Sequence, residues 1–354
     1  MIIYSKSSGL TPNAIGKLET PIKMIIEHES DKLTKAGGIY NTLFNVEKST
    51  RFGETIIGGN EFDVFRAAVE GAGAENDVLV ETYSKFIEHI QFMKEFTISA
   101  EMMEDANYGV AADAKRRAEN FTRAYYKTMN RICEKALADA HKSSTVYANA
   151  TLDLTAPDGL PLFHNEHKWG FEASSSGTQS NTFFGDICCV SDEGGYRTPD
   201  PKVFEIGLYK LAAKMRNMKD ENGEALGYEA DTIILPSNIP ELESTVRKVC
   251  GTPYTLGSNH NDINLNFGRW NVVVLPSWQP DNPRFMIMSS EANKNLCGNM
   301  LFNRVPLTVS NWVDHHTGNY IWNGRCRFGV GFGSYKHIIL AVDTEYGLSY
   351  GEQL

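Results

Sequence analysis

The sequence predicts a mixed fold of helices and sheet, of the α+β class, with one unusually long helix. Three observations lead to this class. Residues 110–141 contain no Pro or Gly and repeat apolar side chains at spacings of three and four, as amphipathic helices do. Residues 86–98 alternate apolar and polar side chains at period two, as strands do. Residues 199–288 alternate helical and strand-like segments, which is typical of helices packed on a sheet.

Size and composition indicate a globular protein. A chain of 354 residues is long enough for two domains, or for one domain with extended arms. Its 42% hydrophobic and 22% charged residues exclude wholesale disorder. The formal charge of −10 argues against a general nucleic-acid binder, which depends on clustered Lys and Arg. The six scattered cysteines form no CxxC pair and indicate reduced thiols.

The chain shows no targeting or membrane signal. The first nine residues lack the apolar core of a signal peptide. No run approaches the roughly 20 apolar residues that cross a bilayer. We therefore expect synthesis and assembly in a cytoplasm, with no membrane partner.

The first 47 residues are expected to form an arm. They contain few apolar residues and are interrupted by Gly and Pro residues, among them Pro12, Gly16 and Pro21. A short amphipathic helix is expected at residues 22–33, but the segment cannot bury itself and should lean on another surface.

Residues 50–98 are expected to form a long two-stranded hairpin. A turn rich in Gly, Ala and Asn at residues 69–77 precedes the second strand. One face of that strand is expected to carry Phe86, Ile90, Phe92, Phe96 and Ile98. Because an isolated hairpin is marginal in water, this one should lie on another surface. The alternative is an outer hairpin of a sheet within the same domain.

A helix over residues 110–141 would be about 48 Å long, at about 1.5 Å per residue. Ser99 is a natural N-cap of a short preceding helix, and Tyr108-Gly109 should break that helix from the long one. The alternative is a core helix of a helical bundle. One face of the long helix is basic. These residues either pair with acidic neighbours, including those of adjacent subunits, or meet nucleic acid: Lys115, Arg116, Arg117, Arg123, Lys127, Arg131 and Lys135.

Further elements follow along the chain. Helices are expected at residues 199–218 and 240–250, and strands at residues 232–236, 271–276, 285–288, 307–313, 319–330 and 337–343. The GxGxG spacing of Gly329, Gly331 and Gly333 lies within a segment whose sequence is typical of a strand. It indicates bulges or tight bends rather than a phosphate cradle, because no helix follows.

The segment HNEH, with His164, Glu166 and His167, is the main candidate for metal chemistry. Helical zinc motifs need ligands at i and i+4, whereas these histidines are three residues apart between Pro161 and Trp169. We therefore expect ordinary hydrogen-bonding histidines. The sequence also lacks GxSxG, P-loop and dinucleotide motifs. It assigns no catalytic, cofactor or metal residue, and the protein is not expected to be an enzyme.

Four segments together carry a resemblance to a known family. They are ISAEMMEDANYG, DGLPLFHNEH, YEADTIILPSNIPELESTVRKV and DHHTGNYIWNGRCRFGVGFGSYKHIILA. Their order and spacing, from about residue 51 onward, resemble the major capsid protein of tailed bacteriophages with the Hong Kong 97 fold. Within that family the chain looks closest to the Mu-type major head subunit group.

The resemblance implies a division into four parts. Residues 1–50 would be an N-terminal arm and residues 51–92 an extended E-loop. A P-domain would comprise residues 93–150 and 305–332, with a spine helix at about residues 99–142. An A-domain would comprise residues 151–304 and 333–354.

The function implied is that of a major capsid protein, which self-assembles into an icosahedral shell around a phage double-stranded DNA genome. Two alternatives remain open: an encapsulin-type compartment shell, and a metal-dependent hydrolase using His164, Glu166 and His167. Contacts between subunits are expected at Arg66, Glu70, Glu75, Lys85, Glu88, Arg116, Arg123 and Lys127.

The implied partners are further copies, as hexamers and pentamers, a portal protein and packaged DNA contacted non-specifically. A separate scaffolding protein and a decoration protein are optional partners. Some relatives carry a cleavable scaffolding segment before the arm, but only about 50 residues precede the E-loop here. Some relatives crosslink Lys to Asn; we assign no such pair. The expected location is the virion, after assembly in the bacterial host cytoplasm.

Overall fold

The structure is a computed structural model that describes residues 3–4, 12–59, 67, 81–101, 108–169, 177–191, 197–254 and 263–344. The chain divides into two compact units. The first unit comprises Met1–Glu54, Ile87–Cys133 and Leu301–Val330. The second unit comprises Thr55–Phe86, Glu134–Met300 and Gly331–Leu354. Each unit contains a five-stranded sheet, which gives the mixed helix and sheet fold that the sequence predicts.

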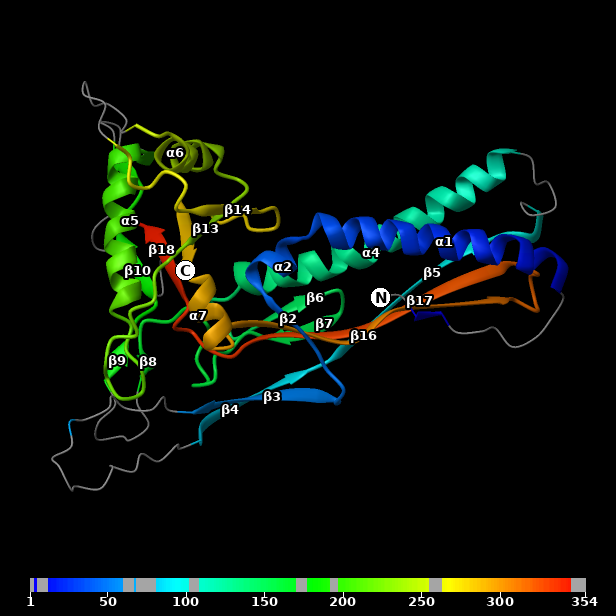
Figure 1. Ribbon diagram of the computed structural model, residues 1–354, viewed down its shortest axis with the longest axis horizontal. Coiled ribbons are helices and arrows are strands. Elements are labelled where there is room, and N and C mark those ends of the chain that lie inside the picture. The colour runs from blue at the N-terminus through cyan, green and yellow to red at the C-terminus, as the bar shows by residue number, and fades with distance from the viewer. Residues whose placement is uncertain are drawn as a thin grey trace. The chain divides into compact units, whose positions relative to one another are not determined.

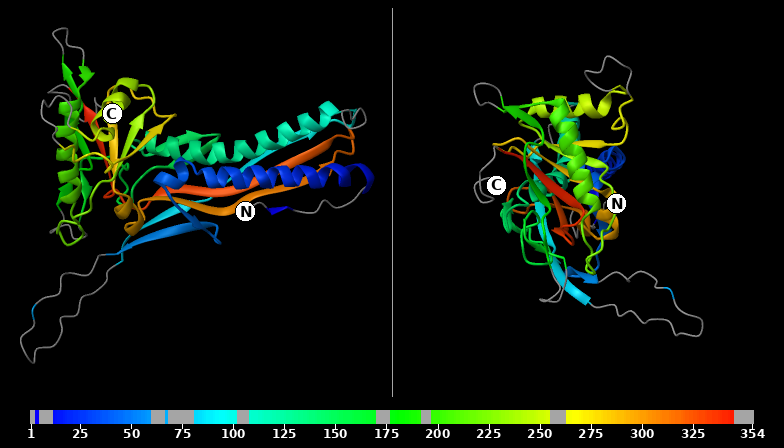
Figure 2. Two further views of the ribbon diagram at one scale, coloured as in Figure 1. Left: turned by 45° about the horizontal axis from the view of Figure 1, so that its top comes forward. Right: turned by 90° about the vertical axis from the view of Figure 1, so that its left-hand side faces the viewer.

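The sheet of the first unit has the strand order β1-β16-β17-β5, and β2 also pairs with β16. The long strand β17 is antiparallel to β5, with Trp322 opposite Phe96. Figures 1 and 2 show helices α1 and α4 running along this sheet. The bounds are β1 Ile3–Tyr4, α1 Pro12–Ala36, α2 Ile39–Leu43, β2 Asn45–Lys48, β5 Ile90–Ile98, α4 Tyr108–Ala138, β16 Asn299–Val313 and β17 Tyr320–Phe332.

The core of the first unit lies between these helices and one face of the sheet. The apolar stripe of α4, represented by Ala118 and Phe121, packs on Leu307 of β16 and Trp322 of β17. The ring of Phe96 contacts the rings of Phe121 and Trp322, with centroid distances of 5.2 Å and 6.1 Å respectively. Burial of these rings stabilises the unit.

The second unit is built on the sheet β10-β18-β15-β13-β14. Its inner strands are buried throughout, and helices α5 and α6 pack on the sheet face that carries Ile233, Phe285 and Ile339. The bounds are β10 Thr182–Gly185, α5 Pro201–Arg216, β13 Thr232–Pro236, α6 Pro240–Gly251, β14 Asn271–Leu275, β15 Arg284–Met288, α7 Ser290–Asn295 and β18 Ile338–Asp343.

Smaller two-stranded ribbons complete the described chain. They pair β3 Gly53–Gly59 with β4 Glu81–Glu88, β6 Ser144–Tyr147 with β7 Ala150–Asp153, β8 His167–Lys168 with β9 Thr178–Gln179, and β11 Cys189–Ser191 with β12 Arg197–Pro199. No helix in the described ranges is long and apolar enough to cross a membrane.

The N-terminal helix is longer than the sequence indicates. The expected short helix at residues 22–33 is wrong in extent, because α1 runs through Gly16 and Pro21. Its residues Ile22 and Ile26 are buried in the same core as Ala114 of α4. Tertiary packing of this apolar stripe therefore outweighs the weak local helix propensity of Gly and Pro.

The expected hairpin strand is split into two strands. β4 pairs with β3, whereas β5 belongs to the sheet of the first unit. His89 lies between the two strands, with Nδ1 2.7 Å from the carbonyl oxygen of Phe52. The alternation changes phase there: Lys85 and Ile87 are buried, and Phe86 is exposed. The prediction that Phe86 shares a face with residues 90–98 is therefore wrong.

The long helix is confirmed, with shifted ends. It begins at Tyr108 and ends at Ala138, so Tyr108-Gly109 open the helix rather than break it. The expected acidic first turns after Ser99 include residues 102–107, which lie outside the described residues.

Candidate assembly surfaces

Three polar contacts fix the N-terminal helix region to α4. Nε of Arg123 lies 2.7 Å from Oε1 of Glu29. The hydroxyl of Tyr126 lies 2.7 Å from Oγ of Ser30, and Oδ1 of Asn130 accepts from the backbone N–H of Tyr40 at 3.3 Å. The hydrogen bond from Arg123 lowers the pKa of Glu29, although burial opposes that shift. The arm is therefore anchored on its own chain.

The basic face of α4 is largely matched by acidic residues of the same chain. Asp113 accepts from Arg116 at 2.6 Å and from Arg117 at 2.7 Å, and the hydrogen bond from Arg117 is the main cause that lowers the pKa of Asp113. Lys135 pairs with Asp139 at 2.6 Å. Pairing with acidic residues of the same chain thus accounts for much of this basic face. This agrees with the first of the two sequence-based alternatives, in which the basic residues pair with acidic neighbours.

The residues expected at subunit contacts differ in their surroundings. Arg116 and Arg123 are exposed, but each already holds an acidic partner within the first unit. Lys127 and Glu88 are exposed. Arg66, Glu70 and Glu75 lie outside the described residues.

Lys85 is buried, unlike the other described members of that set. Its ammonium group donates to Oγ1 of Thr155 at 2.6 Å and also to Oδ2 of Asp153. Burial raises the pKa of Asp153, but the hydrogen bonds from Lys85 and Thr155 outweigh burial and lower it. Lys85 therefore fastens β4 to the last residue of β7 and to the segment that follows it.

The sheet of the first unit presents a second, accessible face. Side chains at alternate positions point away from α1 and α4 there, and they include Met93, Trp312 and Arg325, all exposed. Met93 and Arg325 are direct partners across β5 and β17. An exposed mixture of apolar and cationic side chains is typical of a surface that contacts another molecule.

The histidines of HNEH serve as hydrogen-bonding residues. Nδ1 of His167 lies 2.6 Å from Oδ2 of Asp158, and Nε2 lies 3.0 Å from the carbonyl oxygen of Leu162. The ring also stacks on Tyr335, at 3.9 Å between centroids. Nδ1 of His164 accepts from the backbone N–H of Glu166 at 3.1 Å. Since both nitrogens of His167 face protein oxygens, HNEH does not fit a metal site.

One metal-like cluster occurs among the described residues: Cys188, Cys189 and Asp343. Oδ2 of Asp343 accepts the backbone N–H groups of Cys188 and Cys189, each at 2.8 Å, and the carboxylate also pairs with Arg197 at 2.5 Å. The contact with Cys189, together with burial, raises the pKa of the Cys188 thiol. Metals bind thiolates, so a protonated buried thiol beside a carboxylate already paired with Arg197 and with backbone N–H groups does not fit one.

This cluster was missed by sequence reasoning, because its members are separated by about 150 residues and share no motif. Its role is structural: Asp343, at the end of β18, satisfies backbone donors of the segment that enters β11. Buried polar groups need such partners.

Comparison with known proteins gives one family. The family described as phage capsid protein matches residues 82–341, well over half of the chain. No curated protein matches.

Solved structures share the fold. The capsid structure of the cyanophage P-SCSP1u matches with a TM-score of 0.50 and 9% identity, over 87% of this chain and 89% of that one. The capsid of Myoviridae phage XM1 matches with a TM-score of 0.51 and 11% identity, over 87% of this chain and 92% of that one. At these identities the likeness concerns the fold alone.

Proposed function

The chain belongs to the phage capsid protein family, and on this premise we propose that it forms the icosahedral head that encloses a phage double-stranded DNA genome. Its role as a major capsid shell protein rests on one observation: the family match spans elements of both compact units, from β4 to β18. A structural role in the virion capsid follows from membership in this family.

The finer assignment is the Hong Kong 97 fold, and within it the Mu-type major head subunit group. A helix of 31 residues lying along a long-stranded sheet supports a P-domain with its spine helix. The buried sheet with α5 and α6 supports an A-domain. In this proposal the arm is residues 1–50, the E-loop 51–92, the P-domain 93–150 and 305–332, and the A-domain 151–304 and 333–354.

Assembly would proceed by exchange of contacts between copies, chiefly through the E-loop. Because α1 is anchored on its own α4, the arm contributes less to this exchange than its sequence indicates. Contacts between subunits remain predicted at Arg66, Glu70, Glu75, Glu88, Arg116, Arg123 and Lys127. Lys85 fixes the base of the E-loop within its own chain, which limits where that loop can reach.

The partners proposed are further copies in hexamers and pentamers, a portal protein and non-specifically contacted DNA. Separate scaffolding and decoration proteins are optional. Assembly in the host cytoplasm agrees with the six cysteines, all of which are free thiols.

Electron microscopy of the purified protein, expressed alone and with its phage, tests this function. We expect closed particles of uniform diameter, with DNA in those from infected cells. Particles filled with an enzyme and no DNA would favour the encapsulin alternative. A compact monomer that never forms particles, by light scattering at any concentration tested, would contradict the proposal.

A further inference from the structure

We propose that Lys214 of α5 is a site of covalent acylation, at which the side-chain amine takes an acyl group from a small acyl phosphate. The amine lies in a cluster with the hydroxyl groups of Ser180 and Thr182, beside a strand that carries no acidic side chain. All of these residues belong to the second unit, so the site is independent of assembly and goes beyond the proposed function.

One backbone carbonyl gathers the polar groups of this cluster. Nζ of Lys214 donates to the carbonyl oxygen of Thr182 at 2.6 Å. Oγ of Ser180 donates to the same oxygen at 3.0 Å and also lies 3.0 Å from Oγ1 of Thr182. The lysine amine is thereby held against a neutral acceptor, whereas lysines withdrawn from water are usually paired with a carboxylate.

The surroundings of the amine offer no opposite charge. Nζ of Lys214 lies 5.7 Å from the centroid of the Phe183 ring, and β10, with the sequence TFFG, carries no charged side chain. Within two turns of Lys214, α5 carries no acidic residue. The acidic residue of the neighbouring strand β18, Asp343, lies at the other end of β10, opposite Gly185.

These surroundings favour the neutral amine. Burying a charge without an ionic partner costs free energy, and the unprotonated amine avoids that cost. Burial accordingly lowers the pKa of Lys214 to about 8. At pH 7.5, roughly a quarter of such amines are unprotonated, against about 0.1% of lysines with the ordinary pKa of about 10.4. A desolvated, unprotonated lysine is a nucleophile.

Acyl transfer to this amine balances without another reactant. The nitrogen forms a bond to the carbonyl carbon of the acyl phosphate, and the bond from that carbon to the phosphate oxygen breaks. Phosphate leaves with the electron pair, and the nitrogen releases a proton to water. The amide product is neutral and keeps one N–H, the group that donates to Thr182. Acylation therefore removes a charge that the site disfavours.

Competition between lysines of the full chain tests this site. The purified protein is treated with a limiting amount of acetyl phosphate at pH 7.5, and acetylated peptides are quantified by mass spectrometry. Lys210 is the matched control, because it is exposed and lies one turn away on the same helix. We expect Lys214 to react about tenfold faster, since a roughly hundredfold gain in unprotonated amine exceeds the loss from lower basicity and from a more crowded approach.

The pH profile gives a readout that access to the amine does not change. Free Nα-acetyl-lysine in the same reaction is the reference, and its rate should rise about tenfold per pH unit up to about pH 10. The rate at Lys214 should level off above about pH 8. In guanidinium chloride, which unfolds the chain, Lys214 and Lys210 should react equally.

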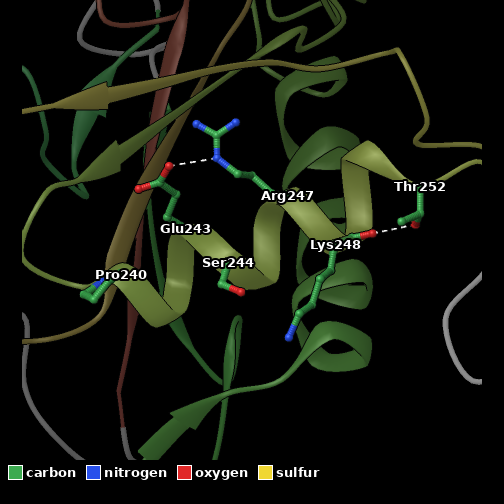
Figure 3. A pocket seen from close by; sticks show the side chains of 6 residues that line it. All are labelled: Pro240, Glu243, Ser244, Arg247, Lys248 and Thr252. Atoms are coloured by element: carbon green, nitrogen blue, oxygen red, sulfur yellow. Dashed lines mark hydrogen bonds and ion pairs between the residues drawn. The ribbon is translucent and has the colours of Figure 1, made fainter.

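Lys248 of α6 is a second control. It is exposed and lines a hollow of about 460 Å³, where Figure 3 shows its side chain pointing away from the ion pair of Glu243 and Arg247. We expect it to react as slowly as Lys210. Acylation of Lys248 as fast as that of Lys214 would show that a concave surface, and not the buried cluster, selects the amine.

A charge placed beside the amine should slow the reaction. Phe183→Glu puts a carboxylate where the ring lies, which favours the protonated amine. Phe183→Gln makes the same polar change without the charge. We expect Phe183→Glu to be acylated at Lys214 about tenfold more slowly than Phe183→Gln at pH 7.5, with circular dichroism confirming that both are folded. Equal rates in the two folded variants would contradict this position of the amine.

The outcomes separate this site from the proposed function. If Lys214 of the parent protein reacts no faster than Lys210, and its rate rises in parallel with that of the free amine, the site is wrong. A preference that persists in guanidinium chloride would also overturn it, because local sequence rather than the fold would be the cause. These measurements do not need particles, so a protein that forms none contradicts the proposed function alone.

Discussion

Nε of Arg123 lies 2.7 Å from Oε1 of Glu29, and this pair joins the middle of α4 to the N-terminal helix α1. Glu29 is almost fully buried, so its charge depends on that partner. A segment that looks too polar to fold alone is thereby fixed on the longest helix of its own chain.

Arg123→Met should loosen α1 without unfolding the rest of the first unit. It leaves Glu29 buried without its arginine, so we expect faster backbone hydrogen exchange in α1 and a melting midpoint lower by about 2–4 °C. Because the pKa of Glu29 is lowered in the fold, its contribution is present above the unfolded value and is lost as pH falls through the folded value. Arg116→Met is the control, because its partner Asp113 is one turn away on the same helix. Equal rates of backbone hydrogen exchange in α1 for Arg123→Met and Arg116→Met would contradict the prediction.

Lys85→Met should destabilise the base of the β3–β4 ribbon. The substitution keeps the aliphatic stem but removes the donor to Asp153 and Thr155, so we expect a loss of about 1–3 kcal/mol in the free energy of unfolding by urea titration. Lys94→Met, at an exposed position of β5, should change it by less than about 0.5 kcal/mol. An unchanged Lys85→Met protein would show that this bond network adds nothing.

Periodicity predicted the buried elements well. Strands such as β13 and helices such as α5 and α6 were found at nearly the expected residues, because burial imposes a period of two or 3.6 on the sequence. The same reasoning failed at Phe86, where His89 lies between two strands and the alternation changes phase. A phase change of one residue leaves no mark in composition.

Contacts between distant segments could not be predicted. Asp343 bonds to the backbone of Cys188 and Cys189, and His167 stacks on Tyr335, across about 155 and 168 residues. Nothing in the local sequence of either partner identifies the other. The exposed side chains of Ile263, Leu265 and Phe267 alternate with asparagines in the sequence, but a Gly- and Asn-rich loop also predicts a simple turn, so their exposure could not be predicted.

Gly207→Ala should destabilise the second unit although alanine favours helices. A Cβ at this position of α5 would lie 2.3 Å from the carbonyl oxygen of Ile187, a backbone atom that cannot move freely. We expect a loss of about 1–3 kcal/mol from overpacking, which exceeds the gain of about 1 kcal/mol in helix propensity. Gly251→Ala, at the open end of α6, should be neutral or stabilising because no atom lies within 4 Å of the added Cβ. Thermal unfolding of both variants decides between sterics and propensity.

His337 should make the second unit sensitive to acid. Its ring is fully buried, with Nε2 2.9 Å from Oδ1 of Asn299, and burial lowers its pKa to about 3. The unfolded chain has an ordinary histidine pKa of about 6.5. Between these values the unfolded state binds the proton and the folded state does not, so stability falls as pH decreases below about 6.5, by at most about 1.4 kcal/mol per pH unit.

His337→Gln removes that titration. Whatever stability the variant loses at pH 7.5, we expect its urea midpoint to fall less than that of the parent between pH 7.5 and 4.5, because glutamine binds no proton in either state. His28→Gln, at an exposed position of α1, should keep the parent slope. Parallel slopes for the parent and His337→Gln would mean that the folded state binds a proton at this ring as readily as the unfolded chain does, so that burial does not lower its pKa.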